Sequence, residues 1–135
     1  PTAQLRLQAI EATAAFEGAR AKVASFIGAA TSQEVVFTKN ASEALNLAAH
    51  TLASRLGPGD EVVVSVMEHH SNLVPWQLAC QSSGATLRWF EITDDGRLDL
   101  TAAVREGLIT ERTRVVSLAW VSNAGAASIS VSTST

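Results

Sequence analysis

Two adjacent histidines, His69 and His70, follow a run of residues that is typical of a buried strand. That run, Glu61–Val66, is rich in β-branched residues, and a helical pattern begins at Leu73. Since open parallel sheets bind ligands beyond the carboxyl ends of their strands, one histidine is a candidate ligand contact. The alternative, which spacing alone favours, is a pair of capping or partly exposed histidines. A metal site is not expected, because adjacent side chains on an extended chain point to opposite faces and no Cys or third His stands at ligand spacing.

A second polar stretch, Lys39–Glu43, lies just before a predicted helix that includes Leu45. Asn40 or Ser42 can cap this helix. Its first turn offers N–H groups without helical partners and the positive end of the helix dipole. A phosphate there would gain a few tenths to about 2 kcal/mol from the dipole. The alternative is an ordinary N-cap without a ligand.

The composition is typical of one globular domain. The 135 residues are 47% hydrophobic and 17% charged with a net charge of -3, so neither a disordered chain nor a nucleic-acid partner is expected. No apolar run approaches a membrane span, and no signal peptide is apparent. Because Cys80 is the only cysteine, we expect a cytoplasmic protein without an internal disulfide. The helical pattern begins almost at Pro1, which favours a chain that is incomplete at its start.

Helical and strand patterns alternate along the chain, which predicts an α/β fold. Right-handed crossovers would give three layers, α/β/α, around a mainly parallel sheet. The predicted helices cover residues 3–26, 45–56, 73–83 and 100–108. The predicted strands cover residues 34–38, 61–66, 86–91 and 114–120. Residues 1–123 would form the domain, and the tail 124–135, which is low in complexity, is expected to be disordered.

Three segments resemble the SUF-type cysteine desulfurases, which are enzymes of the class V aminotransferase fold that use pyridoxal 5'-phosphate (PLP). They are FTKNASEALN, GDEVVVSVMEHHSNLVPWQ and TRVVSLAWVSN, in that order, and the similarity runs from about Gln4 to Asn123. The resemblance implies part of the large domain of a fold-type I PLP-dependent transferase. It also implies conversion of L-cysteine to L-alanine, with the sulfur passed to a protein persulfide for iron–sulfur cluster assembly. The implied partners are a sulfur-acceptor protein and a second copy of the chain.

The resemblance assigns roles to particular residues. His69 matches the histidine that stacks over the pyridoxal ring. Ala41, Ser42 and Glu43 match the turn that holds the cofactor phosphate, which is the same helix start whose free N–H groups favour a phosphate. Asn123 matches the asparagine near the phenolic oxygen of the cofactor.

Other features depart from the family. Trp120 stands where the family has a histidine, and Gly125 follows the asparagine by two residues rather than three. No match is seen beyond Asn123, so three family residues have no counterpart: the Schiff-base lysine, the persulfide cysteine and the aspartate that pairs with the pyridinium nitrogen. We therefore predict no complete catalytic set, weak or absent PLP binding and no activity of this chain alone.

The residues available to replace the missing lysine, cysteine and aspartate are poor candidates. The only lysines are Lys22, which is within a predicted helix, and Lys39, which lies at the phosphate end of the expected site. Cys80 falls in a predicted helix and is expected to be a small core residue. Asp94 and Asp95 precede a glycine and indicate a solvated turn rather than paired catalytic carboxylates.

Two further functions stay open at this point. One is a non-catalytic, truncated or degenerate fragment that at most binds a phosphate or associates with other chains. The other is a different class V PLP enzyme, such as a selenocysteine lyase, since residues that select the substrate lie largely outside the matching stretch.

Overall fold

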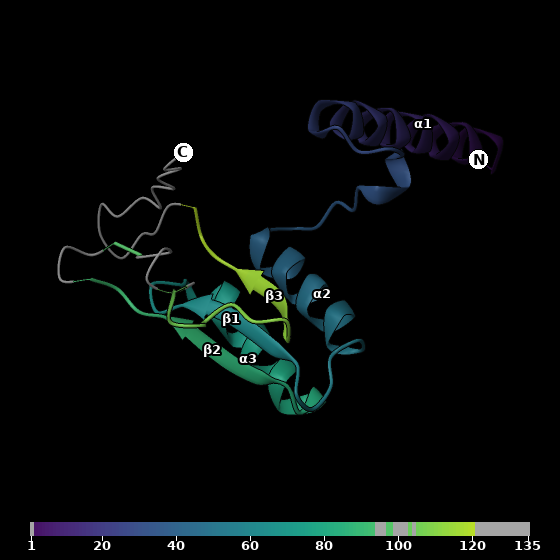
Figure 1. Ribbon diagram of the computed structural model, residues 1–135. Helices are drawn as coiled ribbons and strands as arrows, with labels where there is room; N and C mark the ends of the chain where they lie inside the picture. The colour runs from purple at the N-terminus through teal and green to yellow at the C-terminus, as the bar shows by residue number, and fades with distance from the viewer. Residues whose placement is uncertain (1, 94–96, 99–102, 104, 121–135) are drawn as a thin grey trace. The chain divides into compact units, whose positions relative to one another are not determined.

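The computed structural model describes residues 2–93, 97–98, 103 and 105–120 (Figure 1). The chain forms two compact units, Pro1–Thr38 and Lys39–Thr135, each with its own elements. Several predictions lie outside the described residues: Asn123, the Asp94–Asp95 turn, the tail 124–135, and residues 100–102 and 104 of the predicted helix 100–108. Within that predicted helix, Ala103 and Arg105 are helical, whereas residues 106–108 form a turn and a bend, so the helix ends earlier than predicted.

The first unit is built on helix α1, Thr2–Ile27, which confirms the predicted helix 3–26. Gly28 ends the helix with a φ of 72°, and the N–H of Ala29 donates to the carbonyl of Ala24 at 2.9 Å. Glycine suits this position because a Cβ is disfavoured at positive φ.

The predicted strand 34–38 is wrong. Ser32–Glu34 forms a short 3-10 helix, η1, and the following residues pair with no strand among the described residues. Val35 is buried and the ring of Phe37 lies edge-on to that of Phe16 at 5.4 Å, whereas Val36 is 65% exposed. A high β propensity indicates only that a side chain fits a pleated surface, and a strand also needs a partner backbone.

The second unit contains a parallel sheet of three described strands, β1 (Glu61–Ser65), β2 (Thr86–Phe90) and β3 (Thr113–Ser117). Their order is β2-β1-β3, and β1 pairs in parallel with both neighbours. The other three predicted strands are thus confirmed. All five residues of β1 are buried, as expected for a central strand covered on both faces.

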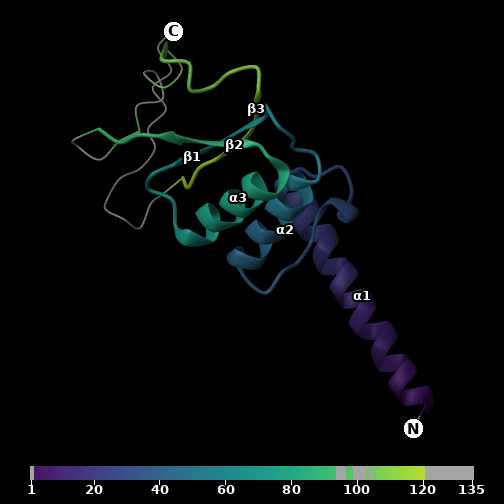
Figure 2. The ribbon, with the colours of Figure 1, turned by 90° about the horizontal axis from the view of Figure 1, so that it is seen from below.

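Side chains of β1 alternate between the two faces of the sheet. Val62 and Val64 face helices α2 (Ala41–Ala53) and α3 (His70–Ser83), which lie on the same side of the sheet in Figure 2. The buried residues of this layer are Ala49, Val62, Val64, Trp76, Ala79 and Cys80. Val63 faces the other way and packs with Phe90, Leu98 and Ala103. The predicted α/β architecture is confirmed.

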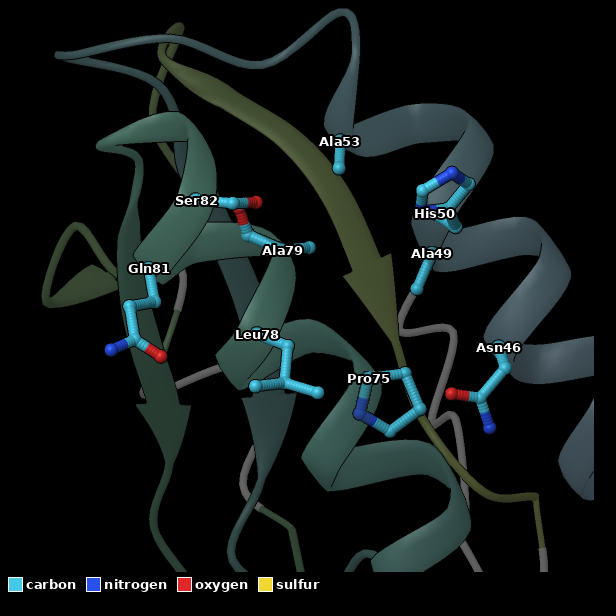
Figure 3. A pocket seen from close by; sticks show the side chains of 9 residues that line it. All are labelled: Asn46, Ala49, His50, Ala53, Pro75, Leu78, Ala79, Gln81 and Ser82. Atoms are coloured by element: carbon cyan, nitrogen blue, oxygen red, sulfur yellow. The ribbon is translucent and has the colours of Figure 1, made fainter.

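Helices α2 and α3 run side by side in the same direction. In Figure 3 the labelled residues progress from Asn46 to Ala53 in α2 and from Pro75 to Ser82 in α3, opposite to the direction of the β3 arrow. The first turns of both helices therefore lie toward the carboxyl edge of the sheet, where parallel sheets bind ligands.

Helix α3 begins at His70, earlier than the predicted Leu73. Pro75 consequently lies in the second helical turn rather than the first, and has no N–H to offer the carbonyl of Ser71. The early start has a local cause: His69 is the N-cap, and its carbonyl accepts the N–H groups of Asn72 and Leu73 at 2.8 and 3.1 Å.

The amino edge of the sheet is held by a buried acid, Glu61. Its carboxylate accepts hydrogen bonds from Arg88 at 3.1 Å, from Arg112 at 2.9 and 3.2 Å, and from the Thr110 hydroxyl at 2.7 Å. The Thr110 hydrogen bond, assisted by the two arginines, lowers the pKa of Glu61 to about 2 despite its burial. These bonds connect β1 with β2 and with the segment that leads into β3.

Candidate functional site

The first turn of α2 has the features of an anion site. Asn40 is the N-cap, as predicted, and its side-chain oxygen accepts the N–H of Glu43 at 2.9 Å. The Glu43 carboxylate in turn accepts the N–H of Lys39 at 2.6 Å. Within the described part of the chain, the N–H groups of Ala41 and Ser42 and the Ser42 hydroxyl donate no hydrogen bond. Three donors thus remain for a ligand at the positive end of the helix dipole.

His69 caps α3 with its own ring. Nδ1 accepts the N–H of Ser71 at 3.1 Å and lies 2.8 Å from the Ser71 hydroxyl oxygen. Because Nδ1 accepts from an N–H group, the neutral ring carries its proton on Nε2. The ring is exposed, and the exposed His70 ring lies 6.1 Å from it, centre to centre. Capping and ligand contact are therefore compatible, since the cap uses Nδ1 and leaves Nε2 and the ring faces accessible.

The structure brings the starts of the two helices to one edge of the sheet. Ser42 lies in the first turn of α2, and His69 immediately precedes α3. Whether the two side chains contact one bound molecule stays a prediction. The predicted role of Asn123 also stays a prediction, because this residue lies outside the described ones.

Two polar residues that flank His69, Glu68 and Asn72, were not identified as important from the sequence. Glu68 accepts hydrogen bonds from the Ser65 hydroxyl at 2.6 Å, the Asn72 amide at 2.7 Å and the backbone N–H of Ala119 at 2.9 Å. Both stand within the string MEHHSN, but residue types alone cannot reveal which side chains meet across strands distant in sequence. The contact with Ala119 depends on the parallel pairing of β1 with β3.

Asn72 is buried and makes the second half of this network. Its side-chain oxygen accepts from the Ser117 hydroxyl at 2.7 Å and from the Trp76 indole N–H at 3.2 Å. Its NH₂ group donates to Glu68. The ends of β1 and β3 and the first turn of α3 are thereby connected through one pair of side chains.

Lys39 and Cys80 keep the modest roles predicted for them. The Lys39 side chain is 83% exposed, and its Nζ lies 3.9 Å from the Glu43 carboxylate. Cys80 is buried in the core beside α2, and burial raises the pKa of its thiol, which disfavours the reactive thiolate. Among the described residues no group of three or more His, Cys, Asp or Glu side chains is placed to hold a metal ion.

A groove of about 500 Å³ lies between α2 and α3 (Figure 3). Most of its lining is apolar, and none of the predicted site residues contributes to it. The groove lies along the middle and later turns of both helices, away from their first turns.

The described helices include none that is long and apolar enough to cross a membrane.

Comparisons with known proteins agree on one family. The family model for class V aminotransferases matches residues 3–131. A probable cysteine desulfurase of Streptomyces coelicolor is 57% identical over 118 residues, covering 84% of this chain and 28% of that protein. A cysteine desulfurase of Dickeya dadantii is 50% identical over 113 residues, covering 83% of this chain and 27% of that protein.

Solved structures give the same result. The cysteine desulfurase CsdA of Escherichia coli superposes with a TM-score of 0.71 at 39% identity, over 87% of this chain and 29% of that one. The cysteine desulfurase of Thermococcus onnurineus superposes with a TM-score of 0.72 at 42% identity, over 84% and 27%. The chain thus spans little more than a quarter of the length of these relatives.

Proposed function

This chain belongs to the class V aminotransferase family, and we propose that it supplies the phosphate- and ring-binding part of a PLP-dependent cysteine desulfurase. The observation that carries the proposal is the first turn of α2, where three donors that have no partner among the described residues lie at the same edge of the sheet as His69. The sequence identity of this chain to cysteine desulfurases also supports the proposal.

The residues present fit PLP at its phosphate end. A phosphate oxygen can accept the N–H groups of Ala41 and Ser42 together with the Ser42 hydroxyl, and the helix dipole favours its charge. Glu43 contributes indirectly, because its backbone N–H and carboxylate hold the turn that contains Asn40 and Lys39.

The ring end is also compatible with the residues present. His69 is exposed, and its Nδ1 is fixed by Ser71, so the imidazole can lie flat against a heteroaromatic ring without losing its cap. When bound, PLP supplies an electron sink for breaking bonds at the carbon that carries the amino group of an amino acid. Within that chemistry His69 would hold the tilt of the ring, and Ser42 would anchor its far end.

The remaining features of the proposed function are inferred from the longer relatives. L-cysteine as substrate, a sulfur-acceptor protein and a homodimer follow from the family, as does Asn123 beside the phenolic oxygen. Alone, this chain would bind PLP weakly and reversibly, because it spans little more than a quarter of those proteins.

The proposal is tested by titrating PLP and inorganic phosphate into the 135-residue chain and following the heat of binding. Ser42→Ala should weaken both ligands about 10-fold, since it removes one hydrogen bond to a charged group. His69→Ala should weaken PLP but not inorganic phosphate.

Ser54→Ala provides the matched control. It removes a hydroxyl from the other end of α2, where Ser54 donates to the carbonyl of Thr51, and should leave both affinities unchanged. PLP binding that is insensitive to Ser42→Ala would contradict the phosphate assignment.

A further inference from the structure

The Glu68 carboxylate joins three segments of the chain. One oxygen accepts from the Ser65 hydroxyl at the end of β1, at 2.6 Å, and the other from the Asn72 amide in the first turn of α3, at 2.7 Å. Both lie close to the N–H of Ala119 beyond β3, at 2.9 and 3.1 Å. Within the described residues, every donor to Glu68 is neutral.

The orientation of Asn72 determines which group must face it. Its oxygen accepts from the Trp76 indole N–H and the Ser117 hydroxyl. An indole N–H can only donate, so the Asn72 amide cannot be reversed without setting two donors against each other. Its NH₂ group must then point to residue 68, which has to accept there as well as from Ser65 and Ala119. A carboxylate meets that demand because it is acceptor-only at both oxygens.

We propose that Glu68 and Asn72 are the positioning pair for His69, an inference that rests on the proposed function of His69 in holding the cofactor ring. Glu68 directly precedes His69, and its hydrogen bonds hold the backbone on that side. Asn72 holds the helical turn that follows His69. Asn72 also donates its backbone N–H to the His69 carbonyl at 2.8 Å. The exposed ring therefore projects from a backbone held on both sides.

The same carboxylate holds a second piece of this edge. Its bond to Ala119 keeps the chain after β3 beside the β1–α3 turn, and Trp120, 69% exposed, follows directly. Glu68 therefore sets the spacing between the His69 turn and the chain leaving β3.

The hydrogen-bonding requirement suggests a reciprocal exchange as the test. Glu68→Gln should set two NH₂ groups against each other, or leave Ser65 and Ala119 facing a donor. Asn72→Asp should set two carboxylates against each other. The double variant restores complementarity, because the new amide at position 68 would donate its NH₂ to the new carboxylate at position 72, while the amide oxygen accepts from Ser65 and Ala119. The net charge of the double variant equals that of the starting protein.

Two readouts apply to the starting chain and the three variants. Nitrogen NMR of the His69 ring, without any cofactor, reports whether Nδ1 still accepts from Ser71. Titrations with PLP and with inorganic phosphate report ring contact separately from phosphate contact. Each single variant should raise the Kd for PLP about 10-fold and leave that for phosphate within about twofold, and the double should return PLP binding to within about threefold.

Ser65→Ala is a milder variant that removes one donor, and it serves if a single exchange prevents folding. It should raise the Kd for PLP about threefold with an intermediate His69 spectrum. The proposal would be overturned if the single variants left the His69 signals and the Kd for PLP unchanged. It would also be overturned if the double variant bound PLP no more tightly than the single variants. If the starting chain fails to bind PLP, the proposed function fails, while the His69 spectra of the four chains still decide whether the pair positions the ring.

Discussion

Glu61 and Glu68 stand near the two ends of β1 and are held by different chemistry. Glu61 is paired with two arginines and a threonine hydroxyl, so the charge of the buried acid is neutralised inside the fold. Among the described residues, the donors to Glu68 are all neutral: a hydroxyl, an amide and a backbone N–H. The amino edge thus uses ion pairs to hold strands together. The carboxyl edge uses neutral donors to fix loop geometry and leaves the His69 ring and three donors of α2 accessible.

The difference has a practical consequence for salt. Ion pairs weaken as ionic strength rises, whereas hydrogen bonds between an acid and neutral donors depend on it less. The loss of stability caused by variants at the amino edge should therefore depend on salt concentration more than the loss caused by variants at the carboxyl edge.

The largest effect is expected for Trp76→Ala, which removes a buried aromatic side chain and the N–H that orients Asn72. It should lower the free energy of unfolding by about 3–5 kcal/mol in urea titrations. Trp76→Phe keeps most of the ring volume and should cost about 1–2 kcal/mol. A loss near zero for Trp76→Phe at both salt concentrations would show that packing, rather than the hydrogen bond to Asn72, explains the whole effect.

A smaller and pH-dependent effect is expected at the amino edge. Since the pKa of folded Glu61 is lowered from 4.5 to about 2, its stabilisation is fully present above pH 4.5 and is lost as pH falls toward 2. Glu61→Gln imitates the protonated acid, so it should be less stable than the starting protein at pH 7. The gap should narrow steadily below pH 4.5.

Urea unfolding at several pH values between 7 and 3 measures this gap directly. Adding salt should also reduce it, unlike the effect of Trp76→Phe. A gap that stays constant down to pH 3 would show that Glu61 is not held in its ionised form by its partners.

Asn40→Ala tests the start of α2 and should cost about 1 kcal/mol, the usual loss for an N-cap. The freed N–H of Glu43 also disturbs the turn around Ser42, so the affinity for inorganic phosphate should fall together with stability. Asn46→Ala serves as the control. It removes an amide of the same helix that donates a hydrogen bond to the carbonyl of Ser42 rather than one that caps the helix. A phosphate affinity that is indifferent to Asn40→Ala would place the anion elsewhere.

The smallest effect is expected for Lys39→Ala. Its side chain is 83% exposed, so stability should change by less than about 0.5 kcal/mol. With PLP and L-cysteine, the chain should produce alanine no faster than free PLP does, with or without this lysine. Sustained alanine production that Lys39→Ala abolishes would show that Lys39 has a catalytic role.

The sequence predicts the parts of this fold that rest on local pattern. Three strands and the Asn40 cap follow from residue types at short spacing. The strand at 34–38 fails because pairing depends on a partner that composition cannot reveal. Glu68 was missed for a related reason, since its contact with Ala119 joins residues that come together only through the order of strands.

The strand order β2-β1-β3 also bears on how the chain folds as it is synthesised. The first of these strands to be made is the central one, and each later strand adds to a different side. The sheet can therefore grow outward from β1, and no completed strand pair has to be opened to admit a later strand. Each outer strand still presents one edge of backbone N–H and C=O groups that pairs with no other described strand, and such an edge is a template for further β-pairing.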